Sequence, residues 1–483
     1  MNYDSKPGLN LTMLTDFYEV TMANGYLKAG LADDIAYFDM FFRNIPDGGG
    51  FAIMAGLEQL IEYLSNLKFT DEDIEYLRGK GIFSEEFLDY LKNFEFKCDV
   101  WSVPEGTPIF PYEPIITVRG PVIQAQFIET MILLVINHQS LIATKANRIV
   151  RAARGRGVME FGTRRAHGTA AAAYGARAAY IGGCIGTACA IADINFGTPA
   201  LGTMAHSWVQ MFDSEYEAFK KYAEIYPNNC TLLVDTYNVL KSGVPNAIKV
   251  FKEMKPKNMG IRIDSGDIAY LTKKARAMLD AAGLKDCKIT VSNSLDEYVI
   301  QDLVFQGAEI DAFGVGERLI TAKSEPVFGG VYKLAALEHD GVITPKIKIS
   351  ENVEKITNPG FKKLYRLYGK EMGKVVADVI TLHDEPVPGS DGEAYAIFDP
   401  KAPWKRKKIT DFQVKDLREK IFDNGKLVYK TPDIEEIRRY CAEQVATLWD
   451  EMYRFEKPQT YYVDLSQKLY DLKTTLIEEH MEK

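Results

Sequence analysis

"MGIRIDSGD", residues 259–267, holds the pattern on which the fold depends. Its first residues are typical of a short buried strand, and polar residues follow at once. The next stretch, "IAYLTKKARAMLDAAG" at 268–283, spaces its apolar residues as an amphipathic helix does. A strand that ends in polar residues and leads into a helix is the repeating unit of parallel α/β proteins.

The same unit recurs on both sides of this stretch, between about residues 136 and 335. The strand candidates are "VMEFGTRR" (158–165), "IGGCIGTA" (181–188), "GTMAHS" (202–207), "TLLVDTYN" (231–238), "MGIRIDSGD", "KITVSNSLD" (288–296) and "DAFGVGERL" (311–319). About seven such units favour an α/β barrel over an open sheet, although the sequence does not show closure. In such barrels the chemistry lies where the strands end, which is where these polar residues stand.

The two flanking segments have a different character. The first mixes amphipathic helices with strand candidates, as in "GLEQLIEYLSNL" (56–67) and "EPIITVRG" (113–120). The last is more charged, with strand candidates "YAIFDP" (395–400) and "KLVYK" (426–430) and helical patterns at 432–455 and 464–483. We therefore expect three segments, with boundaries at 1–135, 136–340 and 341–483.

The composition is that of an ordinary globular protein, with 46% hydrophobic residues, 26% charged residues and a net charge of −9. An acidic chain without clustered Lys and Arg does not fit a nucleic-acid-binding protein. Its one basic run, Lys405–Lys408, predicts a solvated loop.

The sequence also predicts where the protein is found. The first ten residues have no signal-peptide pattern, and no window reaches eighteen apolar residues. We expect a soluble, cytoplasmic protein with neither a membrane nor a nucleic acid as partner. The six cysteines are scattered, without C-x-x-C or histidines at zinc-ligand spacing, so neither disulfides nor a protein-held metal centre is expected.

Each polar cluster at a strand end is ambiguous by itself. The glycines of "FGVGERL" (313–319) fit a phosphate cradle or a tight turn. In "RIDSGD" (262–267) a guanidinium can bind phosphate or carboxylate and the acids can hold ribose hydroxyls or Mg²⁺ waters, while Ser265 or Asp267 equally fits a helix cap. "EFGTRRAHG" (160–168) fits a solvated basic turn as well. Together, the clusters indicate an anionic or phosphorylated substrate that contains a sugar.

One histidine is also a candidate functional residue. "GTMAHSWVQMF" (202–212) places His206 after small residues and before an apolar run. Such a histidine is either a core side chain with one hydrogen bond or a nucleophile.

Seven motifs stand in an order that resembles a known family. They are "TDFYEVTM" (15–22), "EFGTRRAHG", "GTMAHSW", "RIDSGD", "VSNSLDE" (291–297), "FGVGERLIT" and "GGVYKLA" (329–335). Over nearly all of its length the sequence resembles the nicotinate phosphoribosyltransferases. The resemblance implies an irregular (β/α) barrel packed with an α+β domain that both chain ends build. It also implies a homodimer whose active site is shared between subunits.

The resemblance further implies an activity. The family joins nicotinate to 5-phosphoribosyl 1-pyrophosphate, giving nicotinate mononucleotide and pyrophosphate in NAD biosynthesis. It couples this transfer to ATP hydrolysis, with Mg²⁺, through a phosphorylated histidine that matches His206.

Individual site residues carry over from the family motifs. His206 and Asp264 match catalytic positions, the latter positioning the ribose. The nicotinate-binding positions match Tyr18 (from the partner subunit), Phe161, Thr203 and Arg262. The phosphoribosyl and phosphate positions match Arg43, Arg164, Ser292, Asn293, Gly314, Gly316, Thr321 and Lys333. Glu317 and Arg318 stand where the family pattern leads us to expect small residues, and a carboxylate beside a phosphate cradle is unfavourable unless it is paired.

Other functions remain open at this point. In the nicotinamide-specific relative an Asp follows a Gly-Thr pair, whereas here neutral Ala188 follows Gly186 and Thr187, which favours the acid substrate. A barrel that has lost catalysis and serves as a scaffold is a further alternative. A Schiff-base lyase lacks a lysine deep in any strand candidate.

Overall fold

The computed structural model describes residues 11–390, 392 and 394–481. The chain divides into two compact units. One unit runs from residue 142 to 326, and the other combines the described residues up to 141 with those from 327 onward. Both ends of the chain therefore build the second unit.

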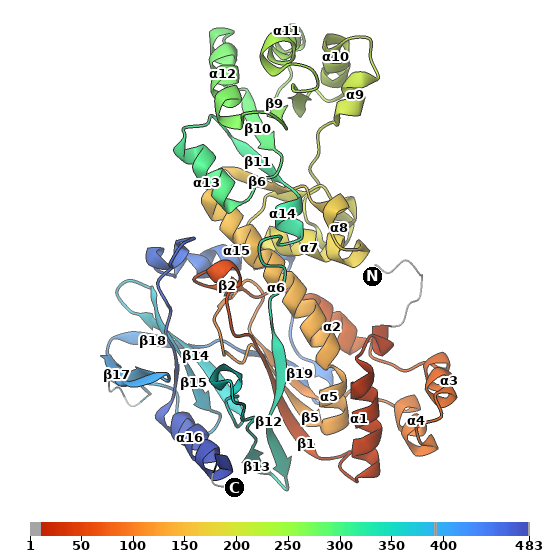
Figure 1. Cartoon of the computed structure of the whole chain (residues 1–483), viewed down its shortest axis with the longest axis vertical. Helices are drawn as coiled ribbons and strands as arrows, with labels where there is room; N and C mark the ends of the chain where they lie inside the picture. The colour runs from red at the N-terminus through yellow and green to blue at the C-terminus, as the bar shows by residue number, and fades with distance from the viewer. Residues whose placement is uncertain (1–10, 391, 393, 482–483) are drawn as a thin grey trace. The chain divides into compact units, whose positions relative to one another are not determined.

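A six-stranded parallel sheet forms the centre of the first unit (Figure 1). Its strands are β6 (Gly157–Glu160), β7 (Gly186–Thr187), β8 (Cys230–Leu233), β9 (Met259–Ile263), β10 (Lys288–Ser292) and β11 (Ala312–Val315). They pair in the order β7-β6-β11-β10-β9-β8, and every pair is parallel. The sheet curls but keeps β7 and β8 as edges, so the expected irregular barrel is an open half-barrel.

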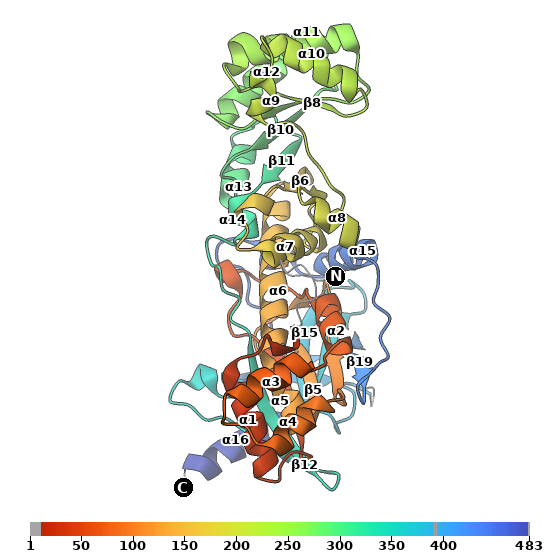
Figure 2. The same ribbon diagram turned by 90° about the vertical axis from the view of Figure 1, so that its right-hand side faces the viewer.

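Helices connect and cover these strands. They are α7 (Thr169–Ile181), α8 (Ala190–Phe196), α9 (His206–Gln210), α10 (Glu215–Ile225), α11 (Val244–Met254), α12 (Ile268–Ala281), α13 (Glu297–Phe305) and α14 (Glu317–Ile320). Figures 1 and 2 place α10, α11 and α12 beside strands β8 to β10. Asp267 caps α12 by accepting a hydrogen bond from the Tyr270 amide at 3.0 Å. In "RIDSGD" the last acid is thus a helix cap.

The expectation that "GTMAHS" forms a strand is wrong. The chain makes only an isolated bridge, between Thr187 and Ala200, before this stretch. The amide of Leu201 donates to the Thr187 carbonyl at 2.7 Å, and the backbone then leaves the sheet. His206 is consequently the first residue of the short helix α9, with Ala205 in the N-cap position.

The second unit is built on a seven-stranded sheet with the order β13-β12-β1-β5-β3-β19-β20. Its strands are β1 (Ile35–Phe41), β3 (Asp99–Ser102), β5 (Ile116–Pro121), β12 (Val331–His339), β13 (Val342–Pro345), β19 (Glu419–Asp423) and β20 (Lys426–Leu427). Three of these strands come from the N-terminal part of the chain and four from the C-terminal part. The C-terminal hairpins β12-β13 and β19-β20 pair with β1 and β3, the outer two of the three N-terminal strands, so one sheet contains both parts of the chain.

Smaller sheets complete this unit. They are β18-β14-β15-β21 (Phe412–Asp416, Lys362–Gly369, Val375–Leu382 and Val463–Leu465), β16-β17 (Tyr395–Asp399 and Ala402–Ile409) and β2-β4 (Ala52–Ile53 and Pro108–Ile109). The helices are α1 (Phe17–Lys28), α2 (Leu57–Ser65), α3 (Asp71–Gly79), α4 (Glu85–Lys92), α5 (Val122–Phe127), α6 (Glu129–Ala152), α15 (Ile434–Ala446) and α16 (Gln467–Met481). Helix α6 continues into the first unit. The helix expected over 432–455 ends at Ala446.

The basic run Lys405–Lys408 is not a loop. It lies in β17, which pairs antiparallel with β16. The four basic side chains are exposed, while Ala402 and Ile409 at the two ends of the strand are buried. Exposed cations on a short edge strand discourage pairing with other chains, which accounts for the composition of this run.

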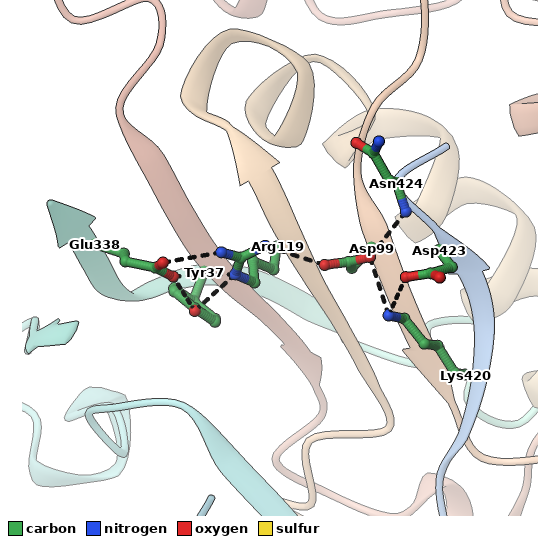
Figure 3. Close-up of polar contacts among 7 residues, drawn as sticks. All are labelled: Tyr37, Asp99, Arg119, Glu338, Lys420, Asp423 and Asn424. Carbon is green, nitrogen blue, oxygen red and sulfur yellow. Dashed lines mark hydrogen bonds and ion pairs between the residues drawn. The ribbon is translucent and has the colours of Figure 1, made fainter. Parts of the chain in front are cut away.

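A polar network crosses one part of the seven-stranded sheet (Figure 3). Arg119 on β5 is opposite Tyr37 on β1 and Asp99 on β3 in the strand register. Its guanidinium donates to the Tyr37 hydroxyl at 2.8 Å and contacts Asp99 at 3.1 Å and Glu338 of β12 at 2.9 Å. The guanidinium lowers the pKa of the Glu338 carboxyl below its usual value. One residue thereby ties four strands together.

Among the described helices, the α5–α6 stretch Val122–Ala152 is long and apolar enough to span a bilayer. Most of its apolar window is buried within the protein, as expected of a core helix of a folded domain.

Candidate active site

Two side chains at the carboxyl end of β9 form the centre of the candidate site. Arg262 lies near the end of this strand, and its Nη1 donates to Thr203 Oγ1 at 2.6 Å. Asp264 follows the strand, and its Oδ1 accepts a hydrogen bond from Ser292 Oγ, at the end of β10. Because β9 and β10 are parallel neighbours, their carboxyl ends bring these side chains together.

His206 faces this cluster from the start of α9. Its Nδ1 lies 3.1 Å from Thr236 Oγ1, and its Nε2 lies 3.9 Å from Asp264 Oδ2. The side chain is 39% exposed, so it is not a core histidine. One ring nitrogen is held by a hydroxyl while the other faces a carboxylate and solvent. An imidazole held through one nitrogen and open at the other has the geometry of a candidate nucleophile.

Two residues of this cluster were not among the sequence predictions. Thr236 orients His206, and Asp235 holds the turn after β9. Asp235 Oδ2 accepts from the Asp264 amide at 3.0 Å and from Ser265 Oγ at 2.6 Å. Its Oδ1 is buried without a hydrogen-bond partner among the described residues. "TLLVDTYN" ends in polar residues like the other strands, so the strand-end rule applied to it would have found both.

Arg262 is a largely buried cation with spare hydrogen-bonding capacity. Burial lowers the pKa of its guanidinium below the usual value, and the carboxylates of Asp264 and Asp235 act in the opposite direction. Its Nε is buried and has no partner within the described part of the chain. An anion bound beside it would supply the missing acceptor.

Glycine at two predicted positions makes room for Phe161. A Cβ on Gly314 would lie 2.6 Å from Phe161 Cδ2, and one on Gly316 would lie 3.2 Å from the Phe161 carbonyl oxygen. A side chain at residue 314 would therefore displace the ring. The amide of Phe161 donates to the Val315 carbonyl at 2.8 Å, which fixes the backbone between these two glycines.

The loop after β10 has an unusual backbone. Asn293 and Ser294 both have positive φ values, 93° and 51°. Such conformations cost energy in residues with side chains and cluster at functional sites. The following Asp296 caps α13 and forms an ion pair with Arg318. The loops that follow β10 and β11 are thus joined by a charge pair.

The two residues that departed from the family pattern are both paired. Glu317 forms an ion pair with Lys323 at 2.7 Å, which lowers the pKa of its carboxyl. Thr321 Oγ1 donates to the Glu317 carbonyl oxygen at 2.7 Å. Arg318 contacts Asp296, as described above. These pairings satisfy the condition under which a carboxylate can stand beside a phosphate cradle.

Arg164 lies in the short 3₁₀ turn Thr163–Arg165 after β6, where its side chain is exposed. The positive charge of Arg164 lowers the pKa of the Arg262 guanidinium. Two cations whose charges act on each other favour the binding of a phosphate or carboxylate.

Three predicted site residues lie in the second unit. Tyr18 on α1 is 45% exposed, and partial burial together with Glu129 raises the pKa of its hydroxyl. Lys333 Nζ lies 3.7 Å from Glu129 Oε1, so Glu129 brings Tyr18 and Lys333 together. Arg43 Nε donates to the carbonyl oxygen of Glu354 at 3.1 Å instead. Glu129 was not predicted from the sequence.

Three family models of nicotinate phosphoribosyltransferase match successive parts of the chain. The N-terminal domain matches residues 13–137, the family model 157–367 and the C-terminal domain 361–473. The Bacillus subtilis nicotinate phosphoribosyltransferase is 46% identical over 472 residues, which cover 97% of this chain and 96% of that protein. The chain belongs to the nicotinate phosphoribosyltransferase family.

The human nicotinate phosphoribosyltransferase is similar to this chain in both sequence and structure. The Homo sapiens nicotinate phosphoribosyltransferase is 30% identical, over 96% of both chains. The crystal structure of human nicotinic acid phosphoribosyltransferase superimposes with a TM-score of 0.83 at 28% identity, and covers 96% of this chain and 100% of that one. The family fold therefore extends over nearly the whole chain.

The neutral residue expected at position 188 in this family lies beside β6. The Ala188 amide donates to the Glu160 carbonyl oxygen at 2.8 Å, next to Phe161. Met159 and Glu160 of β6 pair with Gly186 and Thr187 of β7. The residue after the Gly-Thr pair is thus bonded to the backbone of the residue that precedes Phe161.

Proposed function

We propose that this protein transfers the phosphoribosyl group of 5-phosphoribosyl 1-pyrophosphate to nicotinate, in NAD biosynthesis, and couples the transfer to ATP hydrolysis. The products are nicotinate mononucleotide and pyrophosphate. The observation that carries the proposal is the placement of His206 between Thr236 and Asp264, beside the Arg262–Thr203 pair. A nucleophile, an acid and an anion-binding cation meet there at adjacent strand ends.

Nicotinate binding requires a flat apolar wall and a cation. Phe161 supplies one wall, and Arg262 with Thr203 supplies donors for the carboxylate. Tyr18 of the partner subunit closes the other side of the ring. Helix α1 supports this assignment because Phe17, Tyr18 and Met22 expose apolar surface. We therefore propose a homodimer with a shared active site.

The phosphoribosyl group needs hydroxyl and phosphate contacts. Asp264 would accept hydrogen bonds from the ribose, with Ser292 fixing its carboxylate. The backbone of the loops after β10 and β11 would contact the phosphates. The residues assigned to this role are Ser292, Asn293, Gly314, Gly316 and Thr321, with the cations Arg43, Arg164 and Lys333.

ATP coupling would proceed through His206. Its unprotonated Nε2 attacks the γ-phosphorus of ATP, an N–P bond forms, the bond to the bridging oxygen breaks, and ADP leaves. Nδ1–H donates to Thr236 Oγ1 during this step, which holds the ring in place. Water later cleaves the N–P bond and releases phosphate. Asp264 stabilises the positive charge on the ring between these events.

Mg²⁺ fits the oxygen atoms that the chain offers. Among the described residues no group of three or more His, Cys, Asp or Glu side chains is arranged to hold a metal ion alone. The unpartnered Oδ1 of Asp235 and the carboxylate of Asp264 suit Mg²⁺ that is held chiefly by substrate phosphates. When bound, Mg²⁺ would offset the phosphate charge.

The test is the formation of nicotinate mononucleotide from nicotinate and 5-phosphoribosyl 1-pyrophosphate, with and without ATP. We expect product in both cases and faster turnover with ATP, together with release of ADP. Nicotinamide in place of nicotinate should give little product, because Ala188 offers no carboxylate to accept the amide hydrogen bond. Preference for nicotinamide, or no product with either base, would contradict the proposal.

A further inference from the structure

A fully buried carboxylate lies behind the proposed nicotinate pocket. Glu160 is the last residue of β6, and its side chain has no exposed surface. Its Oε2 accepts a hydrogen bond from Thr187 Oγ1 at 2.6 Å, and its Oε1 accepts one from the Gly162 amide. Thr187 is equally buried. Because Glu160 is closed off from solvent, it acts on a ligand only through its neighbours.

Those neighbours are the two stretches that flank the pyridine in the proposed function. Gly162 immediately follows Phe161, and Thr187 immediately precedes Ala188. The backbone of Glu160 reinforces the side chain, since its carbonyl oxygen accepts from the Ala188 amide at 2.8 Å. One residue therefore fixes both the turn that carries the aromatic ring and the loop that carries the neutral discriminating residue.

The packing around this residue leaves little freedom for the turn. A Cβ on Gly162 would lie 2.5 Å from Ile320 Cβ and 2.7 Å from Glu160 Oε1. The turn is therefore pressed between the carboxylate and α14. A shift of the carboxylate would move the turn, and the Phe161 ring with it.

The donor and the acceptor of each hydrogen bond to the Glu160 carboxylate can also be assigned. The Cys189 amide donates to Thr187 Oγ1 at 2.9 Å, so the Thr187 hydroxyl is free to donate its own hydrogen to Glu160. The Gly162 amide can only donate. Both contacts of the carboxylate are satisfied when Glu160 accepts, although burial raises the pKa of this group above its usual value.

We propose that Glu160 is a positioning residue that holds the Phe161 turn and the Thr187–Ala188 loop as the two walls of the nicotinate pocket, and that the Thr187 hydroxyl transmits this restraint. The inference rests on the proposed function, and it adds a determinant of pyridine binding that does not itself contact the pyridine.

The test compares steady-state KM values for nicotinate and for 5-phosphoribosyl 1-pyrophosphate. Thr187→Val keeps the shape but removes the hydroxyl, which leaves Glu160 Oε2 without its donor. We expect the KM for nicotinate to rise roughly tenfold, as for the loss of a hydrogen bond to a charged group, while the KM for the second substrate changes less than about twofold. Glu160→Gln should shift the same constant in the same direction. Thr187→Ser, which restores the hydroxyl, should return the KM for nicotinate to near the parent value.

Two control variants make the outcome decisive. Glu215→Gln alters another buried, hydrogen-bonded carboxylate of the same unit, which contacts Asn246 at 3.1 Å, and should leave the KM for nicotinate unchanged. Phe161→Ala tests the pocket itself.

If Phe161→Ala raises the KM for nicotinate but Thr187→Val and Glu160→Gln do not, the role of Glu160 is wrong and the proposed function stands. If the parent forms product but Phe161→Ala has no effect, the pocket assignment and this inference both fail. Equal rises in both KM values, matched by Glu215→Gln, would indicate a purely structural role and overturn the inference.

Discussion

At the scale of single residues, the candidate site depends on a few short contacts between strand ends. His206 is oriented by Thr236, and Asp264 by Ser292 and the turn that Asp235 holds. Thr236, Asp264, Ser292 and Asp235 are short polar side chains at or just after the ends of strands, whereas His206 begins α9, so small backbone movements would separate them. The sheet thus fixes the partners of His206, and α9 positions His206 itself.

Arg262→Lys should impair the use of nicotinate. Lysine keeps the positive charge but loses the planar group that reaches Thr203 and an anion at once. We expect kcat/KM for nicotinate to fall roughly tenfold to a hundredfold, since a charge-assisted hydrogen bond contributes about 1.5–3 kcal/mol.

The matched control is Arg276→Lys, an arginine of α12 that pairs with Asp280 and donates to backbone carbonyls. It should leave kcat/KM for nicotinate unchanged. Equal effects of the two substitutions, or no effect of Arg262→Lys, would remove Arg262 from the site.

Much of the site at this scale could be predicted from strand ends alone. Arg262, Asp264 and Ser292 follow from the rule that polar residues after parallel strands converge. The contact between Thr203 and Arg262 could not, because it joins a loop to a strand 59 residues away. The role of Glu129 could not be predicted either, because its partners Tyr18 and Lys333 are far from it and from each other in the sequence.

At the scale of elements, the strand pattern predicts six strands of the half-barrel correctly and fails at "GTMAHS". Short apolar stretches do not distinguish a strand from a helix start, and here the backbone leaves the sheet after Ala200. The open edges of the sheet could not be predicted, because closure depends on strand pairing across the whole unit. Network contacts such as those of Arg119 (Figure 3) are likewise invisible in the pattern of one strand.

A buried ionic cluster joins α6 to α13 within the first unit. Glu297 Oε1 contacts Lys145 Nζ at 2.8 Å and Arg148 Nε at 2.9 Å, and all three side chains are almost fully buried. Glu297 follows the cap of α13 and hence the loop of Asn293. The cluster therefore anchors the helix behind the proposed phosphate loop.

Glu297→Gln should destabilise the protein strongly. The substitution leaves Lys145 and Arg148 buried without their shared negative charge, and breaking such pairs typically costs about 3–5 kcal/mol. Urea unfolding followed by circular dichroism measures the change. The control Glu224→Gln removes an exposed pair with Lys221 and should have little effect. A stability close to that of the parent would show that the cluster does not anchor α13.

At the scale of the whole molecule, stability should depend on pH through buried acids. Asp464 of β21 is 1% exposed, and burial raises the pKa of its carboxyl to about 7. Neither oxygen has a hydrogen-bond partner among the described residues. A pKa raised on folding adds stability that is fully present below the unfolded value of 3.8 and is lost as the pH rises through about 7.

Asp464→Asn should therefore raise the melting temperature at pH 8 and flatten its pH dependence between pH 5 and 8. The amide has nearly the shape of the carboxyl but cannot ionise. Calorimetry at several pH values measures this. Burial also raises the pKa of the Glu19 carboxyl to about 7, so the melting temperature of the variant should keep a smaller dependence on pH. An unchanged pH profile would show that Asp464 does not titrate in this range.

The shared active site that we propose also belongs to the scale of the whole molecule. Mixing Tyr18→Ala protein with His206→Ala protein should restore activity through hybrid dimers, because one site in each hybrid keeps both groups. Exchange of subunits can be followed independently with differently tagged chains. If the chains exchange and no activity returns, Tyr18 and His206 do not act in the same site across the interface.

We propose that His206 becomes phosphorylated during ATP-coupled nicotinate phosphoribosyl transfer, and rapid-quench labelling with γ-³²P-ATP tests this. We expect one acid-labile, base-stable label per chain on the peptide that contains His206. The label should be absent from His206→Ala and should disappear as nicotinate mononucleotide forms. A label on another residue, or ATP hydrolysis by His206→Ala at the parent rate, would contradict this proposal.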